Sequence, residues 1–154
     1  MLENLQRFRA LERPAQTLFL RALVALPLVA LSLKCRGFDK TRATLQKMFS
    51  CANSELNSGF SKKRARLVAH AVNSADRHGL AHFSCLTKSL TLWWLLGRQG
   101  ISSHLRIGVR KENNRLEAHA WVERDGLVVS EPEEQHRHYA AFDTAFANLP
   151  EKER

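Results

Sequence analysis

The stretch LEAHAWVERDGLVVSEP, residues 116–132, decides the fold that we expect for this chain. In its first half, apolar residues alternate with His119 and Trp121, and this alternation predicts a half-buried β-strand. The apolar positions are Ala118, Ala120 and Val122. Buried strands favour aliphatic and aromatic side chains. His119 is therefore either a hydrogen-bonded structural residue or part of a functional site.

The turn after this strand determines which residue faces His119. If residues 124–126 form a three-residue loop with Gly126 in the left-handed conformation, residues whose numbers add to 250 pair with each other. His119 then lies opposite Glu131, with both side chains on one face of the sheet. A two-residue turn at Asp125-Gly126 shifts the register by one and moves Glu131 to the other face. A contact between His119 and Glu131 therefore depends on the turn type.

Helical patterns fill the chain before this hairpin. Residues 3–47 are predicted to be helical in at least two pieces, which Pro14 and Pro27 punctuate, with a kink near Pro27. Gly37 ends the apolar run within them. Serine, asparagine and glycine predict a loop at residues 50–60. A second helix is predicted over residues 62–78, capped by Ser61 and ended by Gly79. Its expected buried stripe consists of Leu67, Val68, Ala71, Val72 and Ala75.

A third helix is predicted over residues 85–97. After it, the spacing of the apolar residues changes from the helical pattern to alternation. Residues 104–110, 116–123 and 127–131 alternate as strands, and a turn is expected at 111–115. Helices followed by an antiparallel meander predict the α+β class. The segment 139–147 is predicted to be a final helix or a loop.

The net positive charge of the chain is concentrated in its N-terminal part. Its formal net charge is +9, and residues 1–66 hold 13 basic and 4 acidic residues, whereas residues 67–154 hold 11 of each. No aromatic RNA-binding motif or zinc finger accompanies the basic part. The pattern therefore favours a solvated helical face over a nucleic-acid site.

Three cysteines, Cys35, Cys51 and Cys85, cannot all form disulfides with one another, and no CxxC spacing is present. This sparse, odd set favours a reducing compartment, or one thiol with a chemical role. We therefore expect a cytoplasmic location, with peripheral membrane contact as the alternative.

The apolar run at residues 17–33 raises the question of a membrane segment. Arg21 interrupts it and leaves 12 residues, where a span needs roughly 20. Glu12 and the lack of a small-residue cleavage site disfavour a signal peptide, and Lys34 disfavours a lipoprotein site. We expect a helix that faces the core or a partner.

Cys85 follows Ser84, a good helix N-cap, and so falls in the first turn of the helix 85–97. Free backbone N–H groups and the helix dipole favour a thiolate there. A thiolate nucleophile needs an imidazole as its partner and proton donor, and His119 is the candidate. The alternatives are a small buried cysteine and a metal site built from Cys85, His119, His136 and His138, whose spacing matches no known pattern.

Two motifs resemble a known family. The stretch CLTKSLTLWWLLGRQGISSHLRIGV, residues 85–109, followed by LEAHAWVERDGLVV, residues 116–129, is similar to the protease domain of lasso-peptide biosynthesis B proteins. These are bacterial cysteine peptidases of the transglutaminase/papain-like superfamily. The helical lead-in resembles theirs as well, so the similarity extends from about residue 7 to residue 143.

The resemblance implies a domain organisation and a function. Residues 1–50 would form a helical segment that packs on a transglutaminase-like peptidase core at 51–147, and residues 148–154 a disordered tail. The protein would cleave the leader from a ribosomally made precursor peptide, without a metal or other cofactor. Because no recognition domain precedes the lead-in, we expect the split form, which acts with a separate leader-recognition protein and an ATP-dependent macrolactam cyclase.

The resemblance also implies residue roles. Cys85 takes the position of the nucleophile and His119 that of the base. The third family residue is usually an aspartate twelve residues after the histidine, and Glu131 stands there. Either Glu131 orients His119, or Glu133 does, or the pair works with a weaker orienting group. The rival hypotheses are a non-catalytic transglutaminase-like binding module and a membrane-associated scaffold built on residues 17–33.

Overall fold

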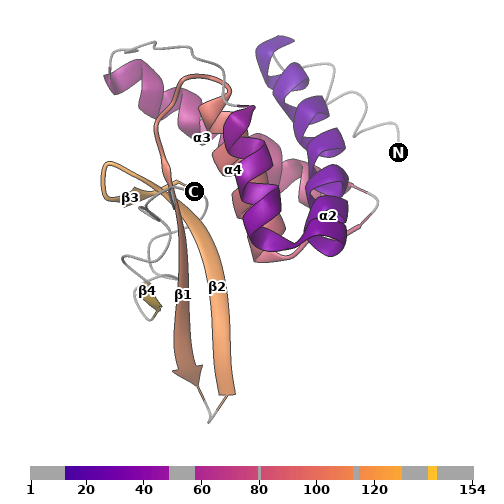
Figure 1. Cartoon of the computed structure of the whole chain (residues 1–154). Helices are drawn as coiled ribbons and strands as arrows, with labels where there is room; N and C mark the ends of the chain where they lie inside the picture. Colours follow the sequence, from indigo (N-terminus) through magenta and orange to yellow (C-terminus); the bar gives the residue numbers. More distant parts are fainter. Residues whose placement is uncertain (1–12, 49–57, 80, 113–114, 130–138, 142–154) are drawn as a thin grey trace, which may run out of the picture.

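The computed structural model describes residues 13–48, 58–79, 81–112, 115–129 and 139–141. Over these residues, helices come first and strands follow, as Figure 1 shows. The elements are α2 (Arg13–Lys47), α3 (Ser58–His78), α4 (Cys85–Gly97), β1 (His104–Glu112), β2 (Arg115–Arg124), β3 (Leu127–Val128) and β4 (Ala140–Ala141). The α+β class predicted from the sequence is confirmed.

Helix α2 is broken at Gly37 rather than near Pro27. Gly37 has φ +77°, whereas Pro27 lies inside the helix. Glycine adopts positive φ at little steric cost, so the chain turns there. The hydroxyl groups of Ser32 and Thr41 lie 2.9 Å apart across the break. This contact holds the last part of α2 against the part that precedes Gly37.

Helix α3 begins at Ser58, earlier than the predicted residue 62, so Ser61 is not its cap and residues 58–60 do not form a loop. Packing of the helix overrides the weak propensity of its serines and glycine. The predicted end, before Gly79, is confirmed. Leu67, expected in the buried stripe, is 45% exposed, while the other four residues of the stripe are buried.

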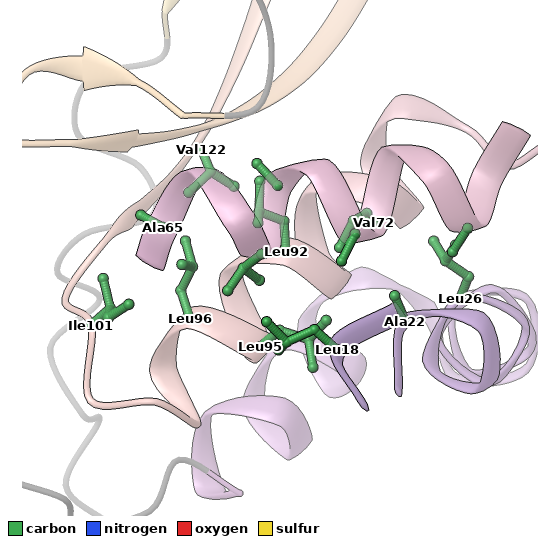
Figure 2. Packing of buried hydrophobic residues seen from close by; sticks show 14 residues of the cluster. Leu18, Ala22, Leu26, Ala65, Val72, Leu92, Leu95, Leu96, Ile101 and Val122 are labelled. Carbon is green, nitrogen blue, oxygen red and sulfur yellow. The ribbon is translucent and has the colours of Figure 1, made fainter. Parts of the chain in front are cut away.

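The three helices share the main core, shown in Figure 2. Leu26 of α2, Val72 of α3 and Leu96 of α4 are almost completely buried in it. Ile101 and Val122 extend the core toward the sheet. Burial of one such side chain stabilises the fold by about 1.5–3 kcal/mol. The core therefore fixes α4, the helix that begins with Cys85.

The sheet has the strand order β3-β2-β1-β4. Strands β1 and β2 pair antiparallel from His104↔Glu123 to Glu112↔Arg115, so their connection is shorter than the predicted turn at 111–115. Leu105 pairs with Val122, and both side chains pack toward the helices. The predicted strand is confirmed, and His119 and Trp121 belong to the face opposite Val122. Burial does not alternate along the strand, because Ala118 is exposed and Trp121 is buried.

The turn between β2 and β3 has two residues, so the second of the two turn types that the sequence left open is the one that forms. Asp125 and Gly126 both have positive φ, +51° and +74°. Arg124 pairs with Leu127, and paired residue numbers add to 251. An Asp-Gly pair suits this turn because its twist matches that of the strands. The register that placed His119 opposite Glu131 therefore does not form; Glu131 itself lies outside the described residues.

Strand β4 falls where the sequence predicted a helix or a loop. Ala140 and Ala141 pair with Val109 and Gly108 of β1. A Cβ atom at Gly108 would lie 2.7 Å from Cη2 of Trp121 and 2.9 Å from the carbonyl oxygen of Ala140. Glycine at this position therefore lets the strand and the indole approach each other. Residues 142–147 and the tail at 148–154 lie outside the described ranges.

Candidate active site

Cys85 is the first residue of α4, as predicted. Ser84 caps the helix, because its side-chain oxygen accepts the N–H of Thr87 at 3.3 Å and its carbonyl accepts the N–H of Lys88 at 3.1 Å. The thiol of Cys85 is free and half-buried. The first N–H groups of a helix have no carbonyl of that helix to donate to. The thiol therefore lies beside donors that can stabilise negative charge.

Asp76 of α3 holds the chain that leads into Cys85. It is 8% exposed, and its Oδ1 accepts the N–H of Phe83 at 2.8 Å. Its Oδ2 lies 3.3 Å from Nζ of Lys88, in the first turn of α4. One carboxylate thus ties α3 to both sides of the cysteine. The sequence reasoning missed this residue, although a carboxylate four residues after Val72 on an apolar stripe was a usable signal.

Ser89 joins α4 to the strand that carries His119. Its hydroxyl donates to the carbonyl of Ala120 at 2.8 Å, and both residues are buried. Ser89 lies one turn after Cys85 on the same side of the helix. Ala120 is the immediate neighbour of His119. The hydrogen bond therefore brings the first turn of α4 to the middle of β2.

The direction of that carbonyl places α4 along an edge of β2. The carbonyl of Val122 accepts the N–H of Val129, so it points away from β1. In an extended strand the carbonyl of Ala120 points the same way. Over the described ranges, β3 pairs with Glu123 and Arg124, and α4 lies beside the earlier part of β2.

The imidazole of His119 belongs to an aromatic cluster. Its ring centroid lies 5.3 Å from that of Tyr139 and 6.2 Å from that of Trp121. The guanidinium of Arg110 lies 4.9 Å from the Tyr139 ring centroid. Tyr139, which precedes β4, was not singled out from the sequence, because nothing local indicates that its segment returns to β1.

Trp121 is fixed by its own contacts. It is 3% exposed, and its Nε1–H donates to Oε1 of Glu123 at 2.7 Å. The other oxygen of Glu123 accepts a hydrogen bond from Nε of Arg106 at 3.1 Å. These contacts hold the indole in place beside His119. Trp93 and Trp94 pack against the core.

The structure brings the helix of Cys85 and the strand of His119 together, but it forms no hydrogen bond between the thiol and the imidazole. In the described part of the chain, Cys85 makes none with His119. Glu131 and Glu133 fall outside that part, so the identity of the third residue stays a prediction. His136 and His138 lie outside it as well, and over the described ranges no three potential metal ligands are grouped.

A model of the transglutaminase-like superfamily matches residues 25–144 of this chain. The chain belongs to the transglutaminase-like superfamily. The matched region of this transglutaminase-like domain runs from within α2 to beyond β4 and contains both Cys85 and His119. The superfamily includes cysteine peptidases. No curated protein and no solved structure matches the chain significantly.

The tie formed by Asp76 gives a prediction for this transglutaminase-like domain. Asp76→Ala leaves the N–H of Phe83 without its acceptor and should lower the free energy of unfolding by about 1–3 kcal/mol. Asp76→Asn keeps an acceptor oxygen and loses only the attraction to Lys88, which is worth up to about 1 kcal/mol at a partly exposed site. Urea unfolding of both variants measures the difference.

Asp39 provides the matched control, since it is an exposed aspartate of α2. Asp39→Ala should leave the stability nearly unchanged. Equal losses for Asp76→Ala and Asp76→Asn would contradict the role assigned to the Phe83 hydrogen bond.

Proposed function

We propose that this protein is a cysteine peptidase that cleaves the leader from a ribosomally synthesised lasso-peptide precursor. The observation that carries the proposal is the position of Cys85 at the start of α4, in a helix that Ser89 joins to the strand of His119. Membership of the transglutaminase-like superfamily supports cysteine chemistry. The choice of precursor rests on the resemblance of residues 85–109 and 116–129 to the lasso-peptide proteases.

The proposed reaction has two steps. The thiolate of Cys85 attacks the carbonyl carbon at the leader–core junction, and the charge that forms on the carbonyl oxygen is stabilised by the backbone N–H of Cys85. The C–N bond then breaks, and the imidazolium of His119 gives its proton to the departing core amine. Water, activated by His119, hydrolyses the thioester and frees the leader.

This mechanism requires the imidazole to reach the thiol when substrate is bound. Hydrogen bonds of catalytic groups are often long in the free enzyme and tighten in the complex with substrate. The edge position of α4 beside β2 favours such an approach, because only one turn of helix separates Cys85 from the contact between Ser89 and Ala120. We propose Glu131 as the group that orients the imidazole, with Glu133 as the alternative. For Glu131 this rests on its position twelve residues after His119 in the resemblance, because the two-residue turn does not pair it with His119.

The proposal includes two partners. A separate leader-recognition protein would present the precursor, and an ATP-dependent macrolactam cyclase would use the core amine that cleavage releases. Hydrolysis of a peptide bond by a thiol and an imidazole needs no cofactor of its own. A reducing, cytoplasmic location would keep Cys85 in its thiol form.

A precursor-cleavage assay with the recognition protein added tests this function. Cys85→Ala should give no detectable cleavage. His119→Ala should lose about 10²–10⁴-fold in rate, which is the usual contribution of a general acid–base group. Glu131→Ala should lose less than His119→Ala, because an orienting residue acts only through the imidazole. Mass spectrometry of the released core measures each rate.

Cys35→Ser is the matched control, since Cys35 is an exposed free cysteine of α2. It should cleave at the wild-type rate. If Cys85→Ala cleaves as fast as the wild type, the peptidase proposal is wrong. If the wild-type protein binds the precursor with its partner and never cleaves it, the domain is the non-catalytic binding module.

A second candidate function, attachment to a membrane surface, is favoured by one face of α2. By length and composition alone, α2 is able to cross a membrane, but residues on one side of it are buried in the core. The opposite side exposes four large apolar residues, each at least half exposed: Leu20, Val24, Leu28 and Leu31. The exposed basic residues Arg13, Arg21, Lys34 and Arg36 flank or interrupt this stripe. We propose peripheral contact with an anionic bilayer as an accessory function.

Sedimentation with phospholipid vesicles tests this contact. The protein should bind phosphatidylglycerol vesicles more strongly than phosphatidylcholine vesicles. A variant with serine at the four apolar positions of the stripe should lose most of this binding. Leu67→Ser with Leu116→Ser removes two exposed leucines elsewhere and should retain it. Equal vesicle binding by the two variants would contradict the assignment to α2.

A further inference from the structure

A groove lies between α3 and the β2–β3 hairpin, apart from Cys85 and His119. Its volume is about 370 Å³. On the α3 side it is lined by Ala65 and Ala69, whose small side chains leave the space open. On the other side it is lined by the apolar residues Leu127, Val128 and Val129. The groove therefore offers apolar walls to a narrow, extended ligand.

The groove has a basic rim. Lys62 and Arg66, one turn apart on α3, line it and are exposed. Among the residues that the structure describes, neither of them meets a carboxylate. Arg124 also lines the groove and lies 3.3 Å from the carboxylate of Asp125, the acidic residue of the lining. The positive charge on the α3 side thus remains available to an acidic partner.

The hairpin side of the groove presents a strand edge. Strand β3 is the last strand of the sheet in the described part of the chain. The N–H of Val129 donates to the carbonyl of Val122, so this residue of the hairpin bonds toward β2. Because successive residues of a strand alternate in direction, the N–H and C=O of Val128 point away from β2. No described residue pairs with this outer edge, and an added strand would take that place.

We propose that this groove binds an extended acidic peptide segment. The segment would pair with the outer edge of β3, set apolar side chains against Ala65 and Ala69, and bring its carboxylates to Lys62 and Arg66. Binding by strand addition takes its affinity from backbone pairing and its specificity from alternate side chains. The site goes beyond the proposed peptidase reaction and does not depend on it.

The test uses the full chain with Cys85→Ala, so that binding is measured without cleavage. The probe is a fluorescein-labelled octapeptide of alternating glutamate and valine, followed by fluorescence anisotropy. The double variant Lys62→Glu/Arg66→Glu should bind it at least tenfold more weakly. It should also gain affinity for the matching lysine–valine peptide, which shows that the variant is folded and that the charge pairing is direct.

Two controls test the position of the charge and the backbone pairing. The double variant Lys63→Glu/Arg77→Glu alters the net charge by the same amount, at exposed α3 residues that do not line the groove. It should bind the acidic probe as strongly as the parent protein. A probe with N-methylated backbone should bind weakly, because it cannot pair with Val128. Equal weakening by both double variants, or unchanged binding of the methylated probe, would overturn the proposal.

Discussion

The hydrogen bond from Ser89 to the carbonyl of Ala120 is the contact on which the candidate site depends. It joins the helical half of the fold to the sheet at a point one turn from Cys85 and one residue from His119. Leaving a buried carbonyl without a donor costs about 1–3 kcal/mol, so α4 is held in this position along the strand. The sulfur and the imidazole come from segments more than thirty residues apart, and this bond sets how those segments meet.

Each half of the fold is rigid for its own reason. Helix α4 is fixed by leucines that the three-helix core buries completely or nearly so, such as Leu92 and Leu96. The aromatic cluster of β2 is fixed by polar ties, since Glu123 binds both the indole of Trp121 and the guanidinium of Arg106. Cys85 belongs to α4 and His119 to β2. A small shift of the helix against the strand therefore changes the distance between the thiol and the imidazole. This arrangement suits a reaction in which substrate completes the contact between thiol and imidazole.

The parts of the fold that follow from local patterns were predictable. Alternation in residues 116–123 gave the strand and the face of His119, and Ser84 gave the start of α4. The features that the sequence did not predict depend on choices between local conformations of nearly equal energy. Asp125-Gly126 supports a two-residue or a three-residue turn, and the choice moves every partner across the sheet by one residue. The contacts of Tyr139 and Asp76 join segments distant in sequence, which no local pattern encodes. The role of Glu131 accordingly stays a prediction.

If His119 acts on Cys85, the imidazole changes the rate at which the thiol is alkylated. Iodoacetamide labelling at mildly acidic pH, followed by mass spectrometry of each cysteine peptide, gives this rate beside that of Cys35 in the same sample. Cys85 should react several-fold more slowly in His119→Ala than in the wild type, while Cys35 should react equally in both. Identical Cys85 rates in the two proteins, with and without a bound precursor peptide, would show that the imidazole does not serve the thiol.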